Sequence, residues 1–577
     1  MAKTIKLADY LFARLKQLGV LAVHGVPGDF NLTLLDFVEP AGLLWVGNAN
    51  ELNAGYAADG YARMKGIGAL ITTFGVGELS AINAIAGAYA ERAPVVHIVG
   101  TPDRATQDGR RHVHHTFNDG EFGRFAKMAV HVTAAQTDLR DPRTSPEQID
   151  HVLLQCILQS RPVYISIPVD MVGAPVAADR LEQVPVCRPL TVPTPYNTGV
   201  VDTILEKIYG AKQPMILIDG ETRALGIMSD VQQLVNITGW PTWLTAFSWG
   251  LVDQTGRNVH GIWKGMFDDE KVKTFANDVD LILCFGPHFS TTNSYSQSAM
   301  PKAHQNVIYV SDTEIRLQAQ DEQILRDIPA TFLMSQLLEK LNPERAASCY
   351  STTYPDLPNQ QSNSTVSDIS CEDDAGITQA SFWPMIEGIV QKGDILLGET
   401  GSAGHGCRVF SLPENVRTFL PVTWLSIGYM LGATQGAALA LREMQKGGRA
   451  ILFIGDGSFQ MTVQELGTII RHNLDVTVIL LNNDGYTIER VIHGLRQKYN
   501  DVAPWRYTEA PSFFGANDTF TATARTCGEL KQILQSGELT KGPGLKFLEV
   551  IMEREDVPKG PLQWLLDRQI EKEASAK

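Results

Sequence analysis

The sequence contains few cysteines, and their spacing argues against the sites that cysteines usually build. There are 7 cysteines among 577 residues, an odd number with no Cys-x-x-Cys pair. They are Cys156, Cys187, Cys284, Cys349, Cys371, Cys407 and Cys527. Neither a disulfide framework nor a structural zinc site is therefore expected. We expect all of them to be reduced thiols, as is usual in cytosolic proteins.

Long apolar runs and basic tracts are also missing. No stretch reaches the roughly 18 apolar residues of a membrane-spanning helix, and the first residues lack the apolar segment of a secretory signal. Lys and Arg number 49 against 64 Asp and Glu, which gives a net charge of −15 without any compensating basic block. Nucleic acid and anionic membranes are therefore not expected as partners. We expect a cytoplasmic protein that holds any anionic ligand locally.

What the sequence does contain is a regular alternation of short apolar runs with helix-length segments. This alternation indicates βαβ units, hence parallel sheets covered by helices on both faces. A chain of 577 residues is too long for one hydrophobic core. We therefore predict an α/β fold with three doubly wound parallel-sheet domains. The expected strands are residues 23–26, 69–73, 95–99, 163–167, 215–219, 281–285, 307–310, 394–397, 450–454, 476–481 and 547–551.

Two segments of unusual composition suggest where the domain boundaries lie. Residues 185–195 are rich in proline, and residues 343–375 are rich in Ser, Thr, Asn and Gln with almost no apolar periodicity. Such a composition cannot bury a core and is typical of an exposed connector. The predicted domains are residues 1–185, 195–343 and 376–577, with residues 344–375 as a linker.

Polar turns follow two neighbouring strands of the third domain. Residues 455–458 (Gly-Asp-Gly-Ser) follow one strand, and residues 482–486 (Asn-Asn-Asp-Gly-Tyr) follow the next. Ligands of open α/β sheets bind at the carboxyl ends of the strands. Asp456, Asn483 and the Gly485 carbonyl, with two diphosphate oxygens and a water, would complete the octahedron that Mg²⁺ requires. Either turn alone would be an ordinary turn sequence.

These two turns, separated by the 24 residues 458–481, resemble the signature of thiamine diphosphate enzymes. The sequence of residues 482–489 is similar to that of the branch of the family that contains pyruvate and indolepyruvate decarboxylases. The resemblance covers nearly the whole chain. It implies an N-terminal pyrimidine-binding (PYR) domain, a central domain without a cofactor role, and a C-terminal diphosphate-binding (PP) domain. The implied cofactors are thiamine diphosphate and Mg²⁺.

The resemblance also assigns roles to residues of the PYR domain. Glu51 matches the glutamate that hydrogen-bonds the pyrimidine N1′ and so helps to remove the C2 proton; taken alone, a glutamate after a strand is usually solvated or capping. His114 and His115 match a pair that polarises the substrate carboxylate and handles protons, with Asp29 beside them. Taken alone, the histidines of residues 112–115 could also form a zinc site or an exposed loop.

In the PP domain, Glu489 matches the decarboxylase glutamate that protonates the reacting carbon. It lies in a predicted helical segment beside Ile488 and Ile492, so we expect these apolar side chains to raise its pKa. We likewise expect an apolar pocket to raise the pKa of Glu51. The resemblance further assigns cofactor contacts to Glu51, Thr400, Ser402, Ile427, Asp456, Gly457, Ser458, Asn483, Gly485 and Tyr486. Ile427 would prop the cofactor into its bent shape, although core packing alone would also explain a large aliphatic residue.

The expected activity is non-oxidative decarboxylation of a 2-oxo acid, with pyruvate giving acetaldehyde and carbon dioxide. The resemblance implies a homodimer or homotetramer whose active sites lie between subunits. Decarboxylation of larger 2-oxo acids (phenylpyruvate, indolepyruvate or branched-chain acids) is the main alternative, because Asn293 and residues 561–566 depart from the usual pattern. A ligase such as acetolactate synthase and a non-catalytic assembly protein are further alternatives.

Overall fold

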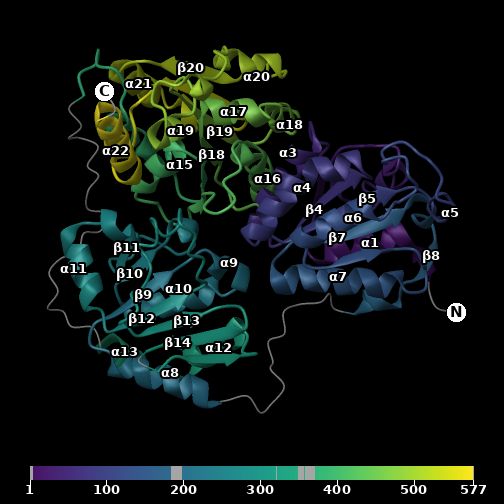
Figure 1. Cartoon of the computed structure of the whole chain (residues 1–577), viewed down its shortest axis with the longest axis horizontal. Helices are drawn as coiled ribbons and strands as arrows, with labels where there is room; N and C mark the ends of the chain where they lie inside the picture. Colours follow the sequence, from purple (N-terminus) through teal and green to yellow (C-terminus); the bar gives the residue numbers. More distant parts are fainter. Residues whose placement is uncertain (1–3, 184–197, 320, 349–356, 358–370, 576–577) are drawn as a thin grey trace.

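The computed structural model describes residues 4–183, 198–319, 321–348, 357 and 371–575. The described chain forms three large sheets and one antiparallel pair, β1 (Thr4–Lys6) with β8 (Pro175–Ala177). Helices flank each of the large sheets (Figure 1). The predicted α/β fold with three sheet domains is confirmed.

The first sheet is entirely parallel and has the strand order β3-β2-β4-β5-β7-β6. Its strands are β2 (Ala22–Gly25), β3 (Leu44–Trp45), β4 (Gly68–Thr73), β5 (Val95–Thr101), β6 (Gln136–Asp138) and β7 (Val163–Pro168). Its helices are α1 (Leu7–Gln17), α2 (Leu32–Leu35), α3 (Glu51–Lys65), α4 (Val76–Ala90), α5 (Arg104–Asp108), α6 (Arg124–Ala129) and α7 (Ser145–Gln159). The sheet lies within the predicted PYR range.

The central sheet differs from a purely parallel one. Its order is β11-β10-β9-β12-β13-β14-β15, and the last two strands are antiparallel to their neighbours. The strands are β9 (Pro214–Ile218), β10 (Thr242–Leu244), β11 (Val259–Ile262), β12 (Leu281–Phe285), β13 (Val307–Val310), β14 (Glu314–Gln318) and β15 (Gln323–Arg326). The helices are α8 (Thr198–Gly210), α9 (Glu221–Leu225), α10 (Met228–Thr238), α11 (Glu270–Asp278), α12 (Ala330–Lys340) and α13 (Pro343–Ser348). Helix α13 occupies the start of the predicted linker, where Ala346 is buried and its carbonyl accepts from the Trp240 indole.

The third sheet is again entirely parallel, in the order β17-β16-β18-β19-β21-β20. Its strands are β16 (Ile395–Gly398), β17 (Arg417–Phe419), β18 (Ala450–Gly455), β19 (Val476–Asn482), β20 (Phe520–Ala524) and β21 (Leu545–Ile551). Its helices are α14 (Gln379–Ile386), α15 (Ser402–Gly406), α16 (Tyr429–Met444), α17 (Asp456–Thr462), α18 (Glu465–Arg471), α19 (Thr487–Ile492), α20 (Ala510–Phe513), α21 (Cys527–Ser536) and α22 (Pro561–Ser575).

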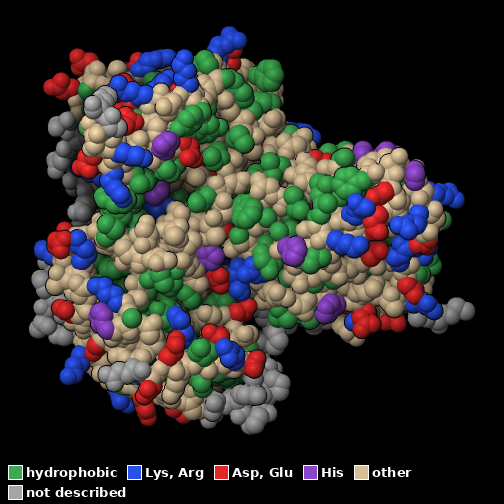
Figure 2. Space-filling model, viewed as in Figure 1, with side chains coloured by type: hydrophobic (Ala, Val, Ile, Leu, Met, Phe, Trp, Pro, Cys, Tyr) green, Lys and Arg blue, Asp and Glu red, His purple; other side chains and the backbone are tan. Residues whose placement is uncertain are grey.

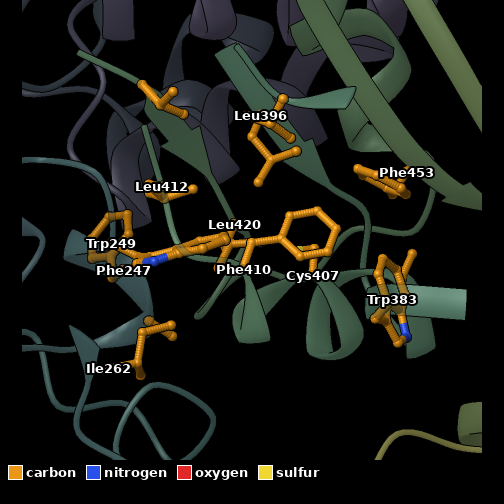
Figure 3. Packing of buried hydrophobic residues seen from close by; sticks show 14 of the residues in the cluster. Phe247, Trp249, Ile262, Trp383, Leu396, Cys407, Phe410, Leu412, Leu420 and Phe453 are labelled. Carbon is orange, nitrogen blue, oxygen red and sulfur yellow. The ribbon is translucent and has the colours of Figure 1, made fainter. Parts of the chain in front are cut away.

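The three domains pack closely on one another. Helix α3 of the PYR domain lies against α16 of the PP domain, where a Cβ on Gly436 would come within 1.8 Å of the Ala57 carbonyl oxygen. Glycine is therefore required at that crossing. The central and PP domains share one hydrophobic core, in which Phe247 and Trp249 of the former lie beside Leu412 and Leu420 of the latter (Figure 3).

The expectation that all cysteines are free thiols is wrong, because Cys371 and Cys527 form a disulfide. They are 156 residues apart in sequence, and the last residues of the predicted linker, with those that follow it, bring them together. Gly376 forms a β-bridge with Thr526, and the Gly528 amide donates to the Asp373 carbonyl. Three other cysteines, Cys156, Cys284 and Cys407, are buried and free, whereas Cys187 and Cys349 lie outside the described residues.

The surface of the described chain mixes charged and hydrophobic side chains. Within the described ranges, no helix is both long and apolar enough to cross a membrane. On the face shown in Figure 2, basic and acidic side chains are interspersed, while hydrophobic side chains gather over the PP domain and continue toward the PYR domain.

Candidate active site

The two polar turns of the PP domain meet at one edge of its sheet. Strands β18 and β19 are parallel neighbours with Gly455 opposite Leu481, so Asp456 and Asn483 leave the sheet side by side. Asp456 is 1% exposed, and its carboxylate accepts from the amides of Gly457 and Gly485, both at 2.9 Å. Burial raises the pKa of Asp456 to about 6, and the two amide hydrogen bonds and the charge of Arg490 offset that rise only in part.

Three oxygens converge between these turns. The Asn483 side-chain oxygen lies 3.2 Å from Asp456 Oδ1 and 3.0 Å from the Gly485 carbonyl oxygen, with no donor between them. With the amide reversed, Asn483 would donate to both oxygens and accept from the Thr487 hydroxyl at 2.8 Å; with the amide as placed, a bound cation would offset the repulsion. Ligands about 2.1 Å from Mg²⁺ on adjacent octahedral corners lie about 3 Å apart. The spacing of the oxygens therefore fits that cation.

The surrounding cavity fits the diphosphate end of the cofactor. It has a volume of about 50 Å³ and is lined by residues of four loops, including all those that the resemblance assigned to cofactor contacts in this domain. They are Thr400, Ser402, Ile427, Asp456, Gly457, Ser458, Asn483, Gly485 and Tyr486. The Thr400 hydroxyl is buried without a hydrogen-bond partner, as expected of a group that a ligand completes. Ile427 is only half-buried, so core packing does not account for it.

Glycines shape this cavity. A Cβ on Gly457 would lie 2.5 Å from the Tyr486 ring. Gly485 has a φ of 129°, and a Cβ there would lie 2.2 Å from the Asn500 carbonyl oxygen. Side chains at either position would displace the loops that carry the converging oxygens.

Glu489 lies at the mouth of the same cavity, on α19 as predicted. Its neighbour Ile488 also lines a second, mostly apolar pocket of about 320 Å³, together with Ile492. The Glu489 side chain itself is exposed, so one chain does not provide the apolar wall expected around it.

The substrate-side pocket corrects one sequence interpretation. Asn293 is not a pocket residue: it is fully buried, and its side chain bonds Asp219, the His288 carbonyl and the Phe247 amide. The pocket wall comes instead from Thr292 and Tyr295, which lie close to Asn293 in sequence, and from the C-terminal Leu562, Trp564 and Leu565.

The PYR domain assembles its own cluster. Asp29 hydrogen-bonds His114 Nε2 and lies 3.7 Å from His115 Nε2, and the Phe30 ring stacks on His114. A Cβ on Gly75 would lie 2.1 Å from the His115 carbonyl oxygen, so this glycine lets the histidine loop approach α4. The ligand atoms of these three side chains lie within 4.8 Å of one another. Sequence spacing could not show this, since Asp29 is 85 residues from His114.

Glu51 begins α3 immediately after its cap. The Asn50 side chain accepts from the Asn53 amide at 2.8 Å and so fixes the start of the helix. A Cβ on Gly77 would lie 3.0 Å from Glu51 Oε1, so the carboxyl borders the start of α4. Glu51 is half-buried, and one chain does not enclose it in the expected apolar pocket.

The two clusters do not meet within one chain. The cavity that contains Asp456, Asn483 and Glu489 is lined by no residue of the PYR domain, and neither is the apolar pocket beside it. Among the described residues, no hydrogen bond or ion pair links Asp29 or Glu51 to that cavity.

Comparison with known proteins assigns both clusters to cofactor-binding domains. The chain matches three family models: "Thiamine pyrophosphate enzyme, N-terminal TPP binding domain" over residues 5–122, "Thiamine pyrophosphate enzyme, central domain" over residues 201–334, and "Thiamine pyrophosphate enzyme, C-terminal TPP binding domain" over residues 399–550. The chain belongs to the thiamine pyrophosphate enzymes. Its cofactor is thus thiamine pyrophosphate (thiamine diphosphate), and the cavity around Asp456 lies in the C-terminal cofactor-binding domain.

Several relatives align over nearly the full length. A pyruvate decarboxylase of Aspergillus parasiticus is 49% identical, with 99% of this chain and 98% of that protein covered. A pyruvate decarboxylase of Aspergillus terreus is 40% identical over 96% and 95%, and pyruvate decarboxylase isozyme 1 of Saccharomyces cerevisiae is 36% identical over 96% and 97%. The X-ray structure of a candidate thiamin diphosphate-dependent enzyme from Mycobacterium smegmatis matches the fold with a TM-score of 0.70 at 17% identity, covering 96% and 100% of the two chains.

Two residues around the site escaped sequence reasoning. Glu399 is fully buried at the end of β16, and it accepts from the amides of Thr400 and Met430 at 2.7 and 2.9 Å. It thereby joins the Thr400 loop to the start of α16, just after Ile427, and burial raises its pKa to about 7. Arg490, the residue after Glu489, is 1% exposed. No local sequence pattern distinguishes Glu399 or Arg490 from a charged surface residue.

Arg490 braces the turn that contains Asn483 and Gly485. Its Nη2 donates to the carbonyls of Asp484 and Asn500 at 2.9 and 3.2 Å and pairs with Asp501 at 2.8 Å. Arg490→Met should weaken Mg²⁺ binding about tenfold or more, as loss of supporting contacts does at other metal sites. Magnesium titration of cofactor-dependent activity measures this, and Arg496→Met, an exposed change six residues on, is the control. An unchanged magnesium affinity would contradict the bracing role.

Proposed function

We propose that the chain is a carboxy-lyase that uses thiamine diphosphate and Mg²⁺ to convert pyruvate to acetaldehyde and carbon dioxide. The observation that carries the proposal is the cavity in which three oxygens converge at magnesium spacing, with Glu489 at its mouth. The full-length similarity to pyruvate decarboxylases supports the substrate.

Each residue has a definable task in this reaction. Asp456, Asn483 and the Gly485 carbonyl would hold the cation, while Ile427 would pack against the bound cofactor. When bound, the cofactor supplies a thiazolium ring that accepts the electron pair left by carbon dioxide. Glu51 would exchange a proton with the pyrimidine N1′.

The remaining groups act on the substrate side. His114 and His115, held by Asp29, would orient the substrate carboxylate and handle protons. Glu489 would deliver a proton to the carbon from which carbon dioxide has left. The apolar lining beside Ile488 excludes water, which favours a step that disperses charge.

We further propose that a complete site forms between two subunits of a homodimer or homotetramer. Both half-sites are open in one chain, and exposed apolar side chains lie next to each of them. Val76, 54% exposed, precedes Gly77 beside Glu51, and Met461, also 54% exposed, lies on α17 with Asp456. A second chain that covers these faces would bring Glu51 of one subunit to Asp456 of the other.

The test is a coupled assay that measures aldehyde release from several 2-oxo acids with thiamine diphosphate and Mg²⁺. Pyruvate should have the highest kcat/KM. The apolar pocket of about 320 Å³ favours one competing result, in which phenylpyruvate, indolepyruvate or a branched-chain acid has the highest value. That outcome would replace the proposed substrate but keep the chemistry. Acetolactate as the main product would make the protein a ligase, and the absence of any aldehyde would make it an assembly protein.

Glu489→Gln should lower kcat at least about tenfold, since the amide cannot supply a proton, and should leave the affinity for thiamine diphosphate within about twofold. Steady-state kinetics and cofactor titration separate these two effects. Glu553→Gln, an exposed change after β21, is the matched control. A selective loss of cofactor affinity would show that Glu489 is a binding residue instead.

A further inference from the structure

A second large cleft opens where the three domains meet. It has a volume of about 740 Å³, and none of the proposed catalytic or cofactor-binding residues lines it. Helix α10 and the loop at residues 250–254 form one wall, and residues 412–417 with the end of α16 form the other. Met64, on α3 of the PYR domain, reaches the same space. A ligand here would contact all three domains.

Arg417, on the edge strand β17, is the anomalous residue of this cleft. The only side-chain contact found for its guanidinium within the described ranges is Nη1 to Met228 Sδ, at 3.3 Å. No carboxylate of those ranges forms an ion pair with it, and burial lowers its pKa. Charges withdrawn from water are normally paired, because burying an isolated charge is costly. This half-buried guanidinium therefore has no counter-charge among the described residues.

The neighbouring charges do not supply it. Arg223 of α9 donates to the carbonyls of Glu91 and Arg92, and burial, followed by the positive charges of Arg63 and Arg417, lowers its pKa to about 9. Arg63 is already neutralised by Asp59 and Glu91. Within the described residues Arg223 and Arg417 form no ion pair, whereas the nearby Arg92 pairs with Glu221 and Asp312.

Two further charged side chains that line the cleft have partners outside its lining. Lys392 is paired with Glu414 at 2.5 Å, and Asp253 accepts from the Thr255 amide at 2.9 Å. Lys446 is an additional exposed cation in the lining. Among the described residues, Asp253 is the only carboxylate that lines the cleft, so the lining favours an anion.

The rest of the wall is mixed, with methionine and leucine side chains beside the polar Ser229, Gln232, Asn236 and Asn415. Met64, Met228, Leu412, Leu441 and Met444 all line the cleft, and Leu412 also belongs to the core shared by the central and PP domains (Figure 3). Flexible methionine side chains adapt to ligands of varied shape. We propose that this cleft binds an organic anion, with its oxyanion head on Arg417 and its apolar body against these methionine and leucine side chains.

The binding test uses the full chain loaded with thiamine diphosphate and Mg²⁺, without any 2-oxo acid. Isothermal titration should show one saturable site per chain for octanoate, for octyl phosphate or for both. The anion that binds with the higher affinity identifies the preferred head group. Octanol has the same apolar chain but no charge, and its affinity should be lower by about tenfold or more. Binding of octanol as tight as that of both anions, or no binding of any probe, would refute the proposal.

Variants assign the head group to Arg417. Arg417→Met should weaken binding of the preferred anion about tenfold or more. Lys392→Met, in the same cleft, should change it less than about twofold, because Glu414 already neutralises that lysine. Equal affinity in Arg417→Met and the parent chain would overturn the proposal.

A stability measurement separates ligand binding from a structural role. Since Arg417 forms no ion pair within the described chain, Arg417→Met should have an unchanged or higher Tm when no anion is present. A lower Tm in the variant would show a structural partner for Arg417 and would count against a ligand site. None of these readouts depends on catalysis, so failure here leaves the proposed reaction untouched.

Discussion

Asp456→Ala should abolish aldehyde release, with kcat/KM falling about a thousandfold or more at ordinary magnesium concentrations. Loss of groups that merely support a metal ligand already costs about 10- to 100-fold in affinity. Asp456 contributes more than support, because it supplies one of the three converging oxygens and the only carboxylate among them. It also orders the second turn through the Gly485 amide at 2.9 Å.

The effect should be traceable to the metal. Mg²⁺ titration of Asp456→Ala should show an affinity lowered about 100-fold or more, with weak activity returning only at high magnesium. Asp484→Asn is the matched control, since Asp484 lies in the neighbouring turn but pairs with Arg554 at the surface. Its magnesium affinity should stay near that of the parent chain. Wild-type magnesium affinity in Asp456→Ala would remove this residue from the metal site.

The sequence predicted these features to different extents. Strands such as Leu281–Phe285 and Val307–Val310 were predicted to the residue, because buried parallel strands are continuous apolar runs. Short strands such as Thr242–Leu244 were missed, since three residues carry no periodicity. Helix α13 was assigned to the linker because its polar composition hides a single buried residue, Ala346.

Proximity in the site was predictable where residues follow neighbouring strands of one sheet, and not where it depends on contacts between distant segments. Asp456 and Asn483 follow neighbouring strands, so their proximity follows from sheet topology. Glu399 could not be inferred in the same way, because its role depends on the Met430 amide, which sequence spacing does not place. The disulfide of Cys371 and Cys527 is of this kind as well.

Glu51→Gln should slow exchange of the cofactor's C2 proton by about 100- to 10,000-fold, the usual range for a general acid–base group. Glutamine keeps the size and hydrogen-bonding reach of the side chain, but it cannot exchange a proton with the pyrimidine. Proton exchange followed by NMR on the bound cofactor measures the effect directly. Glu39→Gln, an exposed change in the same domain, is the control. Retention of fast exchange would exclude Glu51 from this step.

The same variant decides whether sites are shared between subunits. In a hybrid dimer of one Glu51→Gln chain and one Asp456→Ala chain, shared sites would combine both defects in one site and leave the other intact. Such a hybrid, co-expressed with two affinity tags and purified through both, should recover about half of the parent activity. If each site were built within one chain, every site of the hybrid would carry one defect and the activity would stay near zero. The measurement therefore distinguishes the two arrangements with variants that are each inactive alone.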